Sequence, residues 1–205
     1  MAKTALVIAK GKRLKGLKAL AEKADCVICA DGGLKNAAKE GIRPDCIIGD
    51  FDSAGDRLVS KYPSSEVISF PRDKDMTDTE LAILHARSLG FKRIILACAL
   101  GGRIDHELAN VFLLQKFRGM LALVGDGFEM SVAGKNMRFD AEIGSIVSLF
   151  AVGGDAEGVS ASGLRFQLKD AKVLAGSSLG VSNIASERCV KISVRKGSLL
   201  VVRCF

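Results

Sequence analysis

Acidic residues cluster where apolar, strand-like runs give way to polar loops, and the first such loop is 49–53 (GDFDS), after the apolar run 46–48. Asp50 and Asp52 are two residues apart, so on extended backbone their carboxylates point the same way. Adjacent like charges are costly unless a cation lies between them, and hard oxygen ligands favour Mg²⁺, usually shared with substrate phosphates. The spacing therefore predicts a Mg²⁺ site. The alternative is a turn that is simply rich in Asp and Ser.

The second cluster, 71–80 (PRDKDMTDTE), follows another apolar run and opens a predicted helix. Thr77 begins a capping box, and Asp78 in the first turn opposes the helix dipole, so both have a sufficient structural explanation. Lys74 and Asp75 are not needed for capping. Charges of both signs at a helix start suit a metal–phosphate site, with Lys74 as a phosphate contact.

The third cluster, 100–110 (LGGRIDHELAN), again joins a strand-like run to a predicted helix. Its glycines allow close approach of a ligand to the backbone, and Arg103 can bind phosphate through two parallel hydrogen bonds. Asp105 is either a ligand contact or only the helix N-cap. His106 and Asn110 share one helix face, and His106 is either a proton carrier or a structural residue.

Familiar nucleotide and zinc motifs are absent from the sequence or incomplete. Segment 11–18 (GKRLKGLK) has the glycine spacing of a P-loop, but Leu17 replaces the required Lys. Neither a GxGxxG nor a GxSxG motif occurs. Cys26 and Cys29 form a CxxC without a second half, and on a strand they would point to opposite faces, so we interpret them as buried thiols and not as a zinc site.

Short apolar runs alternate with helix-like segments through the first 125 residues, a rhythm that is typical of a parallel sheet covered on both faces. This predicts a doubly wound, mainly parallel α/β domain over 1–125, with ligands bound outside the carboxyl ends of the strands. The predicted strands are 4–9, 26–30, 46–48, 66–70, 93–100 and 121–124, and the predicted helices are 12–23, 33–40, 54–62, 77–89 and 105–117.

After Gly125 the pattern changes to short alternating stretches separated by Gly-rich turns. It predicts an all-β sandwich domain over 126–205. Lys196 and Gly197 are expected to form a hairpin turn between the last two strands. The expected strands are 145–152, 163–168, 190–194 and 199–202.

The chain has 205 residues, of which 48% are hydrophobic and 26% charged, an ordinary globular composition. Its net charge of +7 is diffuse, and neither interleaved aromatics nor a nucleic-acid module is visible, so we expect no nucleic-acid partner. No apolar run reaches the ~20 residues of a membrane span, and the N-terminal run is too short for a signal peptide. We expect a soluble, cytoplasmic protein without membrane contact.

Taken in order, the motifs resemble the thiamine pyrophosphokinase family from about residue 26 to the end. Each motif is weak alone, but the ordered series is specific. The motifs are Ala30-Asp31-Gly32-Gly33, Pro44-Asp45, the 49–53 loop, Lys74-Asp75-x-Thr77-Asp78, Gly102-Arg103-x-Asp105-His106-x-x-x-Asn110, Gly163-Leu164 and Gly180-Val181-Ser182-Asn183.

The resemblance implies transfer of a diphosphoryl group from ATP to the hydroxyl of thiamine, giving thiamine diphosphate and AMP. It also implies the same order of α/β domain and β-sandwich, and a homodimer with the site between subunits. Mg²⁺ and the polyphosphate would be held by Asp50, Asp52, Asp75 and Asp78, which with Arg103 form the implied catalytic set. ATP would contact Asp31, Gly32, Lys74, Thr77, Arg103, Asp105 and His106, and thiamine would contact Ser182 and Asn183.

Two features depart from the family pattern, and both concern the acceptor. Ile184-Ala185 follow Asn183 where the family has an acidic residue and an aromatic, and the chain has no Trp to stack on thiamine. Either Phe166 or Phe150 would supply a stacking face for thiamine in place of a tryptophan, or each is simply a core residue. The alternatives are a pyrophosphokinase for another heterocyclic alcohol, such as a hydroxymethylpterin, and a non-catalytic nucleotide- or thiamine-binding sensor.

Overall fold

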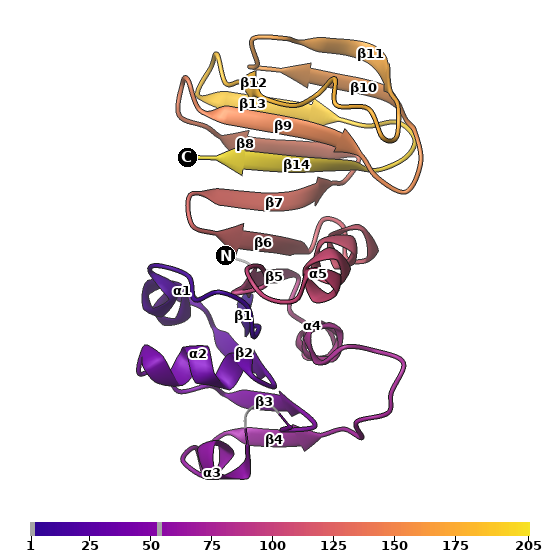
Figure 1. Cartoon of the computed structure of the whole chain (residues 1–205). Coiled ribbons are helices and arrows are strands. Elements are labelled where there is room, and N and C mark those ends of the chain that lie inside the picture. Colours follow the sequence, from indigo (N-terminus) through magenta and orange to yellow (C-terminus); the bar gives the residue numbers. More distant parts are fainter. Residues whose placement is uncertain (1–2, 53–54) are drawn as a thin grey trace. The chain divides into compact units, whose positions relative to one another are not determined.

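The computed structural model describes residues 3–52 and 55–205 (Figure 1), so Ser53 of the first acidic loop lies outside the described residues. The chain divides into two compact units. The first comprises Met1–Leu113 and Ala122–Asp126, and the second comprises Leu114–Leu121 and Gly127–Phe205.

A mainly parallel sheet forms the centre of the first unit, with its strands in the order β6-β5-β1-β2-β3-β4. The pairs β5–β1, β1–β2, β2–β3 and β3–β4 are all parallel. β1 and β2 are apolar and almost wholly buried, as expected of strands covered on both faces. The strands are β1 (Thr4–Ile8), β2 (Cys26–Ala30), β3 (Cys46–Gly49), β4 (Glu66–Ser69), β5 (Arg93–Ala97) and β6 (Leu121–Gly125).

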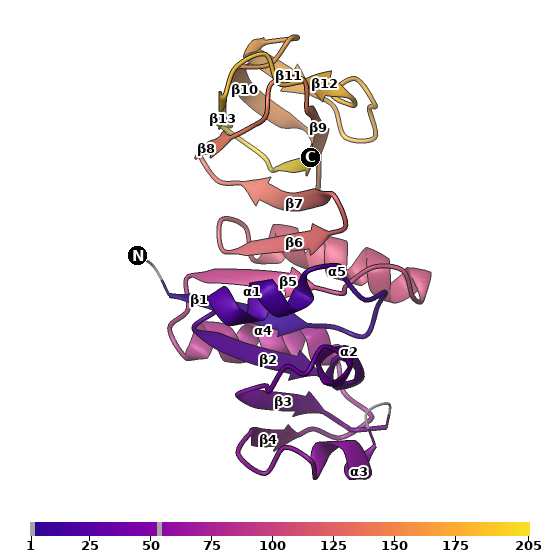
Figure 2. The same ribbon diagram turned by 90° about the vertical axis from the view of Figure 1, so that its left-hand side faces the viewer.

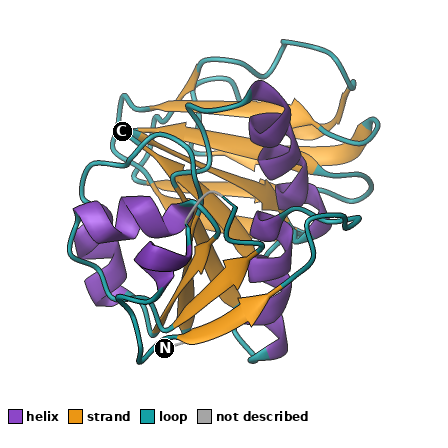
Figure 3. Cartoon of the chain, turned by 60° about the horizontal axis from the view of Figure 1, so that its bottom comes forward, coloured by secondary structure: helices purple, strands orange, loops and turns teal. Residues whose placement is uncertain are grey.

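Helices cover both faces of this sheet, which confirms the doubly wound α/β prediction. Figures 1 and 2 place α1 and α2 on one face and α4 and α5 on the other, and Figure 3 shows the same layers coloured by secondary structure. Among the described residues, no helix is long and apolar enough to cross a membrane. The helices are α1 (Leu17–Lys23), α2 (Gly33–Lys39), α3 (Asp56–Val59), α4 (Asp78–Ser88) and α5 (Ile104–Lys116).

Two backbone positions explain where the predicted boundaries were wrong. The helix expected over 12–23 begins only at Leu17, because Gly16 has a φ of 74°, which an α-helix cannot accommodate. The strand expected over 93–100 ends at Ala97, because Cys98 has a φ of 55°. The helix expected over 54–62 is reduced to the single turn of α3 within its described part.

The second unit is a sandwich of two antiparallel sheets, as predicted. One layer consists of β12-β9-β14-β7, which are neighbours in that order within the larger sheet, and the other is the four-stranded sheet β11-β10-β13-β8. Buried aliphatic side chains from both sheets, among them Val147, Leu149, Val190 and Ile192, form the core between them. The strands are β7 (Phe128–Ala133), β8 (Asn136–Asp140), β9 (Ile146–Ala151), β10 (Ala156–Ser162), β11 (Leu168–Val173), β12 (Asn183–Ile184), β13 (Cys189–Ser193) and β14 (Leu199–Cys204).

The predicted hairpin at Lys196 and Gly197 is wrong. β13 pairs with β8 and β10, whereas β14 pairs with β7 and β9, so these residues lead the chain from one sheet to the other. The backbone N–H of Glu157 donates to the carbonyl of Lys196 (2.9 Å), which holds the crossing against β10. The two apolar strands can therefore fill the core from opposite sides.

The strand expected over 163–168 is also wrong. Gly163 has a φ of 78°, and a Cβ there would lie 2.4 Å from the carbonyl oxygen of Cys189. The segment therefore bends away from an extended path. Leu164 forms only an isolated bridge with Ala185, and the next strand begins at Leu168.

Candidate active site

The three charged motifs meet in one pocket of about 800 Å³ in the first unit. They do so because β2, β3, β4 and β5 are parallel, so the loops that follow them emerge at the same end of the sheet. Of the predicted first-unit residues, Gly32 and Asp105 do not line the pocket. Those that do are Asp31, Asp50, Asp52, Lys74, Asp75, Thr77, Asp78, Arg103 and His106.

Three carboxylates that line this pocket lie close together. One oxygen from each of Asp31, Asp50 and Asp78 lies within 4.8 Å of the other two. Asp31 directly follows β2, Asp50 directly follows β3, and Asp78 is the first residue of α4. The geometry thus adds Asp31, which the family resemblance had assigned to ATP, to the acidic group. Asp52 and Asp75 line the same pocket without belonging to this closest triad.

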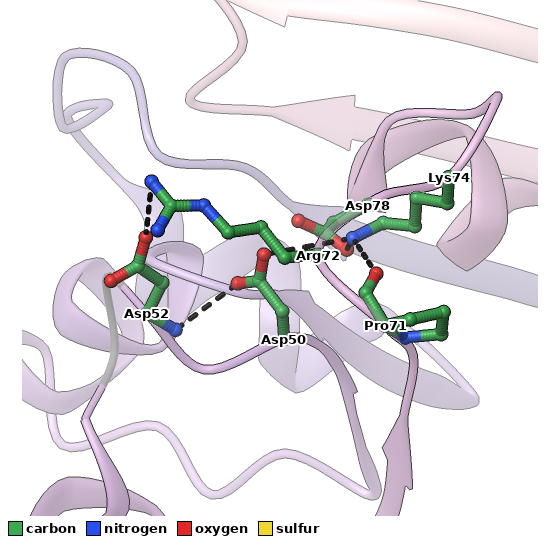
Figure 4. Close-up of polar contacts among 6 residues, drawn as sticks. All are labelled: Asp50, Asp52, Pro71, Arg72, Lys74 and Asp78. Carbon is green, nitrogen blue, oxygen red and sulfur yellow. Dashed lines mark hydrogen bonds and ion pairs between the residues drawn. The ribbon is translucent and has the colours of Figure 1, made fainter.

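Lys74 supplies a positive charge beside these acids (Figure 4). Its ammonium lies 3.2 Å from Asp78 Oδ1 and 3.7 Å from Asp50 Oδ2, and it donates a hydrogen bond to the carbonyl of Pro71 (3.0 Å). Burial raises the pKa of Asp78, while the hydrogen bond and charge of Lys74 act in the opposite direction. The lysine therefore stabilises carboxylates that would otherwise repel one another.

The acidic triad fits a hard divalent cation. Asp78 Oδ1 is buried, and the Lys74 ammonium lies 3.2 Å from it. Together with Asp31 and Asp50 it offers three carboxylates and no sulfur or imidazole, which is the donor set that Mg²⁺ prefers. Such a cation would neutralise the negative charge that Lys74 leaves on the cluster.

Asp50 and Asp52 have different environments although they are two residues apart. The side chain of Asp50 is 18% exposed and faces Lys74, whereas that of Asp52 is 59% exposed and lies 3.4 Å from Arg72 Nη2. The backbone N–H of Asp52 donates to Asp50 Oδ1 (3.1 Å), as Figure 4 shows. Asp50 is therefore oriented toward the triad, and Asp52 lies at the rim of the pocket.

Unusual backbone conformations set these side chains in place. Asp31 and Phe51 have φ values of 39° and 60°, both in the left-handed region. The N–H of Asp31 donates to the carbonyl of Ile48 (2.7 Å), which joins the ends of β2 and β3. A Cβ at Gly49 would lie 2.9 Å from Asp31 Cβ, so glycine is needed where the two loops touch.

The start of α5 brings Arg103 and His106 to the pocket. The Arg103 guanidinium is hydrogen-bonded to Asp105 through two nitrogens, and this contact lowers the pKa of Asp105 to about 2. Asp105 thus orients Arg103, although it does not itself line the pocket. Asn110 is buried and donates to the carbonyl of Ala99 (2.9 Å), which ties α5 to the end of β5.

The sequence interpretation assigned no role to three charged residues of this pocket, Lys10, Arg72 and Glu107. Lys10 follows β1, and its side chain lies so close to Gly32 that a Cβ there would be 2.5 Å from Lys10 Cδ. Its position after a buried parallel strand was the available signal. Glu107 accepts a hydrogen bond from the N–H of Gly102 (2.7 Å), so it shapes the glycine turn before α5.

In the second unit, Ser182 and Asn183 lie at the start of β12. Ser182 is exposed and has a φ of 58°, and its N–H donates to Ser148 Oγ (3.0 Å). The buried amide of Asn183 accepts from the N–H of Phe166 (3.0 Å) and donates to the carbonyl of Phe166 (2.7 Å). The Phe166 ring is left 65% exposed, so Asn183 holds the backbone of an exposed aromatic.

Family models match both units of the chain. The model described as "Thiamin pyrophosphokinase, catalytic domain" matches residues 17–122, and "Thiamin pyrophosphokinase, vitamin B1 binding domain" matches residues 136–199. The chain belongs to the thiamin pyrophosphokinase family. The catalytic-domain match includes the whole acidic triad, and the vitamin B1-binding match includes Ser182 and Asn183.

Relatives within the thiamin pyrophosphokinase family are similar along most of their length. Thiamine pyrophosphokinase 1 of Arabidopsis thaliana is 27% identical over 88% of this chain and 78% of its own length. The thiamine pyrophosphokinase of Bacillus subtilis is 27% identical over 86% of both chains. The solved structure of the thiamin pyrophosphokinase from Geobacillus thermodenitrificans is similar with a TM-score of 0.88 at 26% identity, over 98% of this chain and 97% of its own.

Lys74→Met in this family member is expected to lower the free energy of unfolding by about 1–3 kcal/mol in the absence of divalent cations. The substitution removes the positive charge between Asp50 and Asp78 and leaves their carboxylates uncompensated. Because Mg²⁺ can replace that charge, it should stabilise the variant more than the wild type. Chemical denaturation with EDTA and with Mg²⁺ measures both effects. Lys92→Met, at an exposed lysine, is the control, and equal Mg²⁺ responses in all three proteins would contradict the prediction.

Proposed function

We propose that this protein transfers the diphosphoryl group of ATP to the hydroxyl of thiamine, producing thiamine diphosphate and AMP. The observation that carries this proposal is the convergence of Asp31, Asp50 and Asp78 beside Lys74, within the part of the chain that matches the family's catalytic domain. Polyphosphate chemistry requires such a charge-compensating centre. Relatives that carry the name thiamine pyrophosphokinase support thiamine as the acceptor.

The reaction forms one bond and breaks one bond. The hydroxyl oxygen of thiamine attacks the β-phosphorus of ATP, and the bond between that phosphorus and the α–β bridging oxygen breaks. AMP leaves with the bridging oxygen, and the hydroxyl proton passes to a carboxylate or to water. Because this transfer needs no protein nucleophile, the residues contribute positioning and charge neutralisation.

Mg²⁺ would be held by Asp31, Asp50 and Asp78, with Asp52 and Asp75 at the rim of the same pocket. When bound, it neutralises the polyphosphate charge that develops during transfer. The Lys74 ammonium, which lies 3.7 Å from Asp50 Oδ2 and 3.2 Å from Asp78 Oδ1, would bind a phosphate oxygen of ATP beside the metal.

The residues around the triad would bind ATP. Arg103, held in its orientation by Asp105, offers planar donors to a phosphate at the pocket wall. Thr77 is already used as the N-cap of α4, because its side chain accepts from the N–H of Glu80 (3.2 Å). Its role is therefore to fix the helix start that carries Asp78. His106 lines the pocket as a polar contact.

Thiamine would bind at the second unit, where Ser182 offers a hydroxyl and Phe166 an exposed ring. Asn183 would act by holding Phe166, since its amide already bonds to that backbone. We further propose a homodimer with the active site between subunits, a cytoplasmic location and no nucleic-acid partner, as the family resemblance and the composition imply.

Ser182→Ala is expected to raise the KM for thiamine by roughly 2- to 13-fold, with a much smaller change in the KM for ATP. Loss of one neutral hydrogen bond costs about 0.5–1.5 kcal/mol. The phosphate-binding residues all lie in the first unit, so the ATP site should be unaffected. Steady-state kinetics with each substrate varied measures the split. An unchanged thiamine KM in a folded variant would move the acceptor site elsewhere.

The acceptor is tested by incubating the protein with Mg²⁺, ATP and one alcohol at a time and measuring AMP. We expect AMP formation with thiamine at a far higher kcat/KM than with a hydroxymethylpterin. A preference for the pterin would support the alternative pyrophosphokinase. Calorimetric binding of ATP and thiamine without AMP formation would support the sensor and overturn the proposed activity.

A further inference from the structure

A second group of side chains with closely spaced ligand atoms lies at the other end of the parallel strands, where β3 and β4 begin. Cys46 and Glu66 are the first residues of β3 and β4, and His85 lies near the end of α4. One ligand atom from each, a sulfur, a carboxylate oxygen and an imidazole nitrogen, lies within 4.8 Å of the other two. His85 follows Asp78 by two helical turns, so this group is remote from the acidic triad.

The sheet register brings these residues to one face. Cys46 pairs with Ile28 of β2 and with Glu66 of β4, and partners in a parallel pair point their side chains to the same side. α4 packs against β1, β2 and β3 on this side, which delivers His85 to the group. Cys29 lies in the hydrophobic core formed with α1 and α2, on the other side of the sheet.

The imidazole of His85 has an unused ring nitrogen in this group. His85 Nε2 is buried and has no hydrogen-bond partner among the described residues. It lies 3.8 Å from Glu66 Oε2, which is too long for a hydrogen bond. Two nitrogen or oxygen ligands on a tetrahedral zinc ion are roughly 3.4 Å apart, given bonds of about 2.0–2.2 Å, so Glu66 and His85 already lie near the separation that zinc requires.

The chemistry of the three donors selects the metal. A thiolate, an imidazole and a carboxylate together suit Zn²⁺, whereas Mg²⁺ prefers oxygen alone. Burial raises the pKa of the Cys46 thiol to about 12, so without a metal this group is a neutral thiol and not an activated nucleophile. The side chain of Glu66 is 61% exposed on β4 and provides a path from solvent.

We propose that Cys46, Glu66 and His85 bind one Zn²⁺ ion, with the fourth position open to water. The ion would join the first residues of β3 and β4 to the later turns of α4, the helix whose first residue is Asp78. Binding displaces the thiol proton of Cys46 to solvent and changes no oxidation state. The proposal is independent of the proposed function, because none of its three residues lines the active-site pocket.

Cobalt(II) provides a direct test, because a thiolate ligand gives it a charge-transfer absorption band that carboxylates cannot produce. We expect the wild-type chain to bind one cobalt ion that produces this band, and stoichiometric zinc to abolish the band. Uptake without the band would place the ion among carboxylates, and that result, like the absence of uptake, would overturn the proposal.

Variants assign the site. Glu66→Gln changes an exposed side chain, so the variant should fold. We expect it to weaken zinc binding at least about tenfold, because mutating residues that only support metal ligands already lowers metal affinity by about 10–100-fold. His85→Gln should do the same. Cys29→Ala removes a buried cysteine on the other face of the sheet, so this variant should keep the wild-type affinity for zinc. Wild-type affinity in Glu66→Gln, or loss of binding in Cys29→Ala alone, would contradict the assignment.

Discussion

Asp50→Asn is expected to lower kcat by roughly 10²–10³-fold while leaving the fold intact, the usual effect of losing one preorganised electrostatic contact. Asp50 contributes a carboxylate to the triad, faces Lys74 and is only 18% exposed. Asparagine keeps its shape but removes the charge that would hold Mg²⁺ against the polyphosphate. Steady-state rates at saturating ATP and thiamine measure the effect, and circular dichroism checks the fold.

Asp73→Asn is the matched control, because Asp73 is exposed in the same charged segment as Lys74 but does not line the pocket. We expect its kcat to stay near that of the wild type. The kcat of Asp52→Asn should lie between the kcat values of Asp50→Asn and Asp73→Asn, because Asp52 lies at the rim of the pocket and pairs with Arg72. Equal activity of Asp50→Asn and Asp73→Asn at low Mg²⁺ would remove Asp50 from the site.

Gly33→Ala is expected to destabilise the protein by about 1–3 kcal/mol, or to lower Tm by about 2–12 °C. Alanine normally stabilises a helix by about 1 kcal/mol relative to glycine, so the expected sign is the reverse of the propensity effect. The reason is steric: a Cβ at Gly33, the first residue of α2, would lie 1.9 Å from the carbonyl oxygen of Ile8. Thermal denaturation measures the change.

Gly134→Ala serves as the comparison, because a Cβ there meets nothing within 4 Å and the residue has no positive φ. We expect its Tm to change little or to rise slightly, through the reduced entropy of the unfolded chain. A Gly33→Ala variant as stable as Gly134→Ala would contradict the close packing of α2 on the end of β1.

Local patterns were enough to predict the architecture of the first unit. The runs that became β1, β2 and β3 are apolar throughout, and the charged loops after β3, β4 and β5 stand at strand ends, so a parallel topology necessarily gathers them. Asp50, Asp78 and Arg103 were accessible to sequence reasoning for that reason. The family resemblance added thiamine and ATP, which neither composition nor periodicity indicates.

Features that depend on tertiary contacts were not predictable. Asp31 directly follows the apolar run that became β2, so its position at a strand end was predictable, but its place in the triad depends on a left-handed turn and a hydrogen bond to Ile48. The crossing after β13 looked like a hairpin, because a Lys-Gly turn between apolar runs does not reveal which sheet the next strand will join. Likewise, the side-chain amide of Asn183 is hydrogen-bonded to the backbone of Phe166, 17 residues away, which no local pattern indicates.

The fate of each phosphate of ATP tests the proposed diphosphoryl transfer most directly. The wild-type protein is incubated with thiamine, Mg²⁺ and ATP that carries heavy oxygen in the non-bridging positions of its β-phosphate, and the products are resolved by mass spectrometry. We predict one AMP for each thiamine diphosphate, with the label in thiamine diphosphate and none in AMP. Formation of ADP together with thiamine monophosphate would show transfer of a single phosphoryl group and would contradict the account.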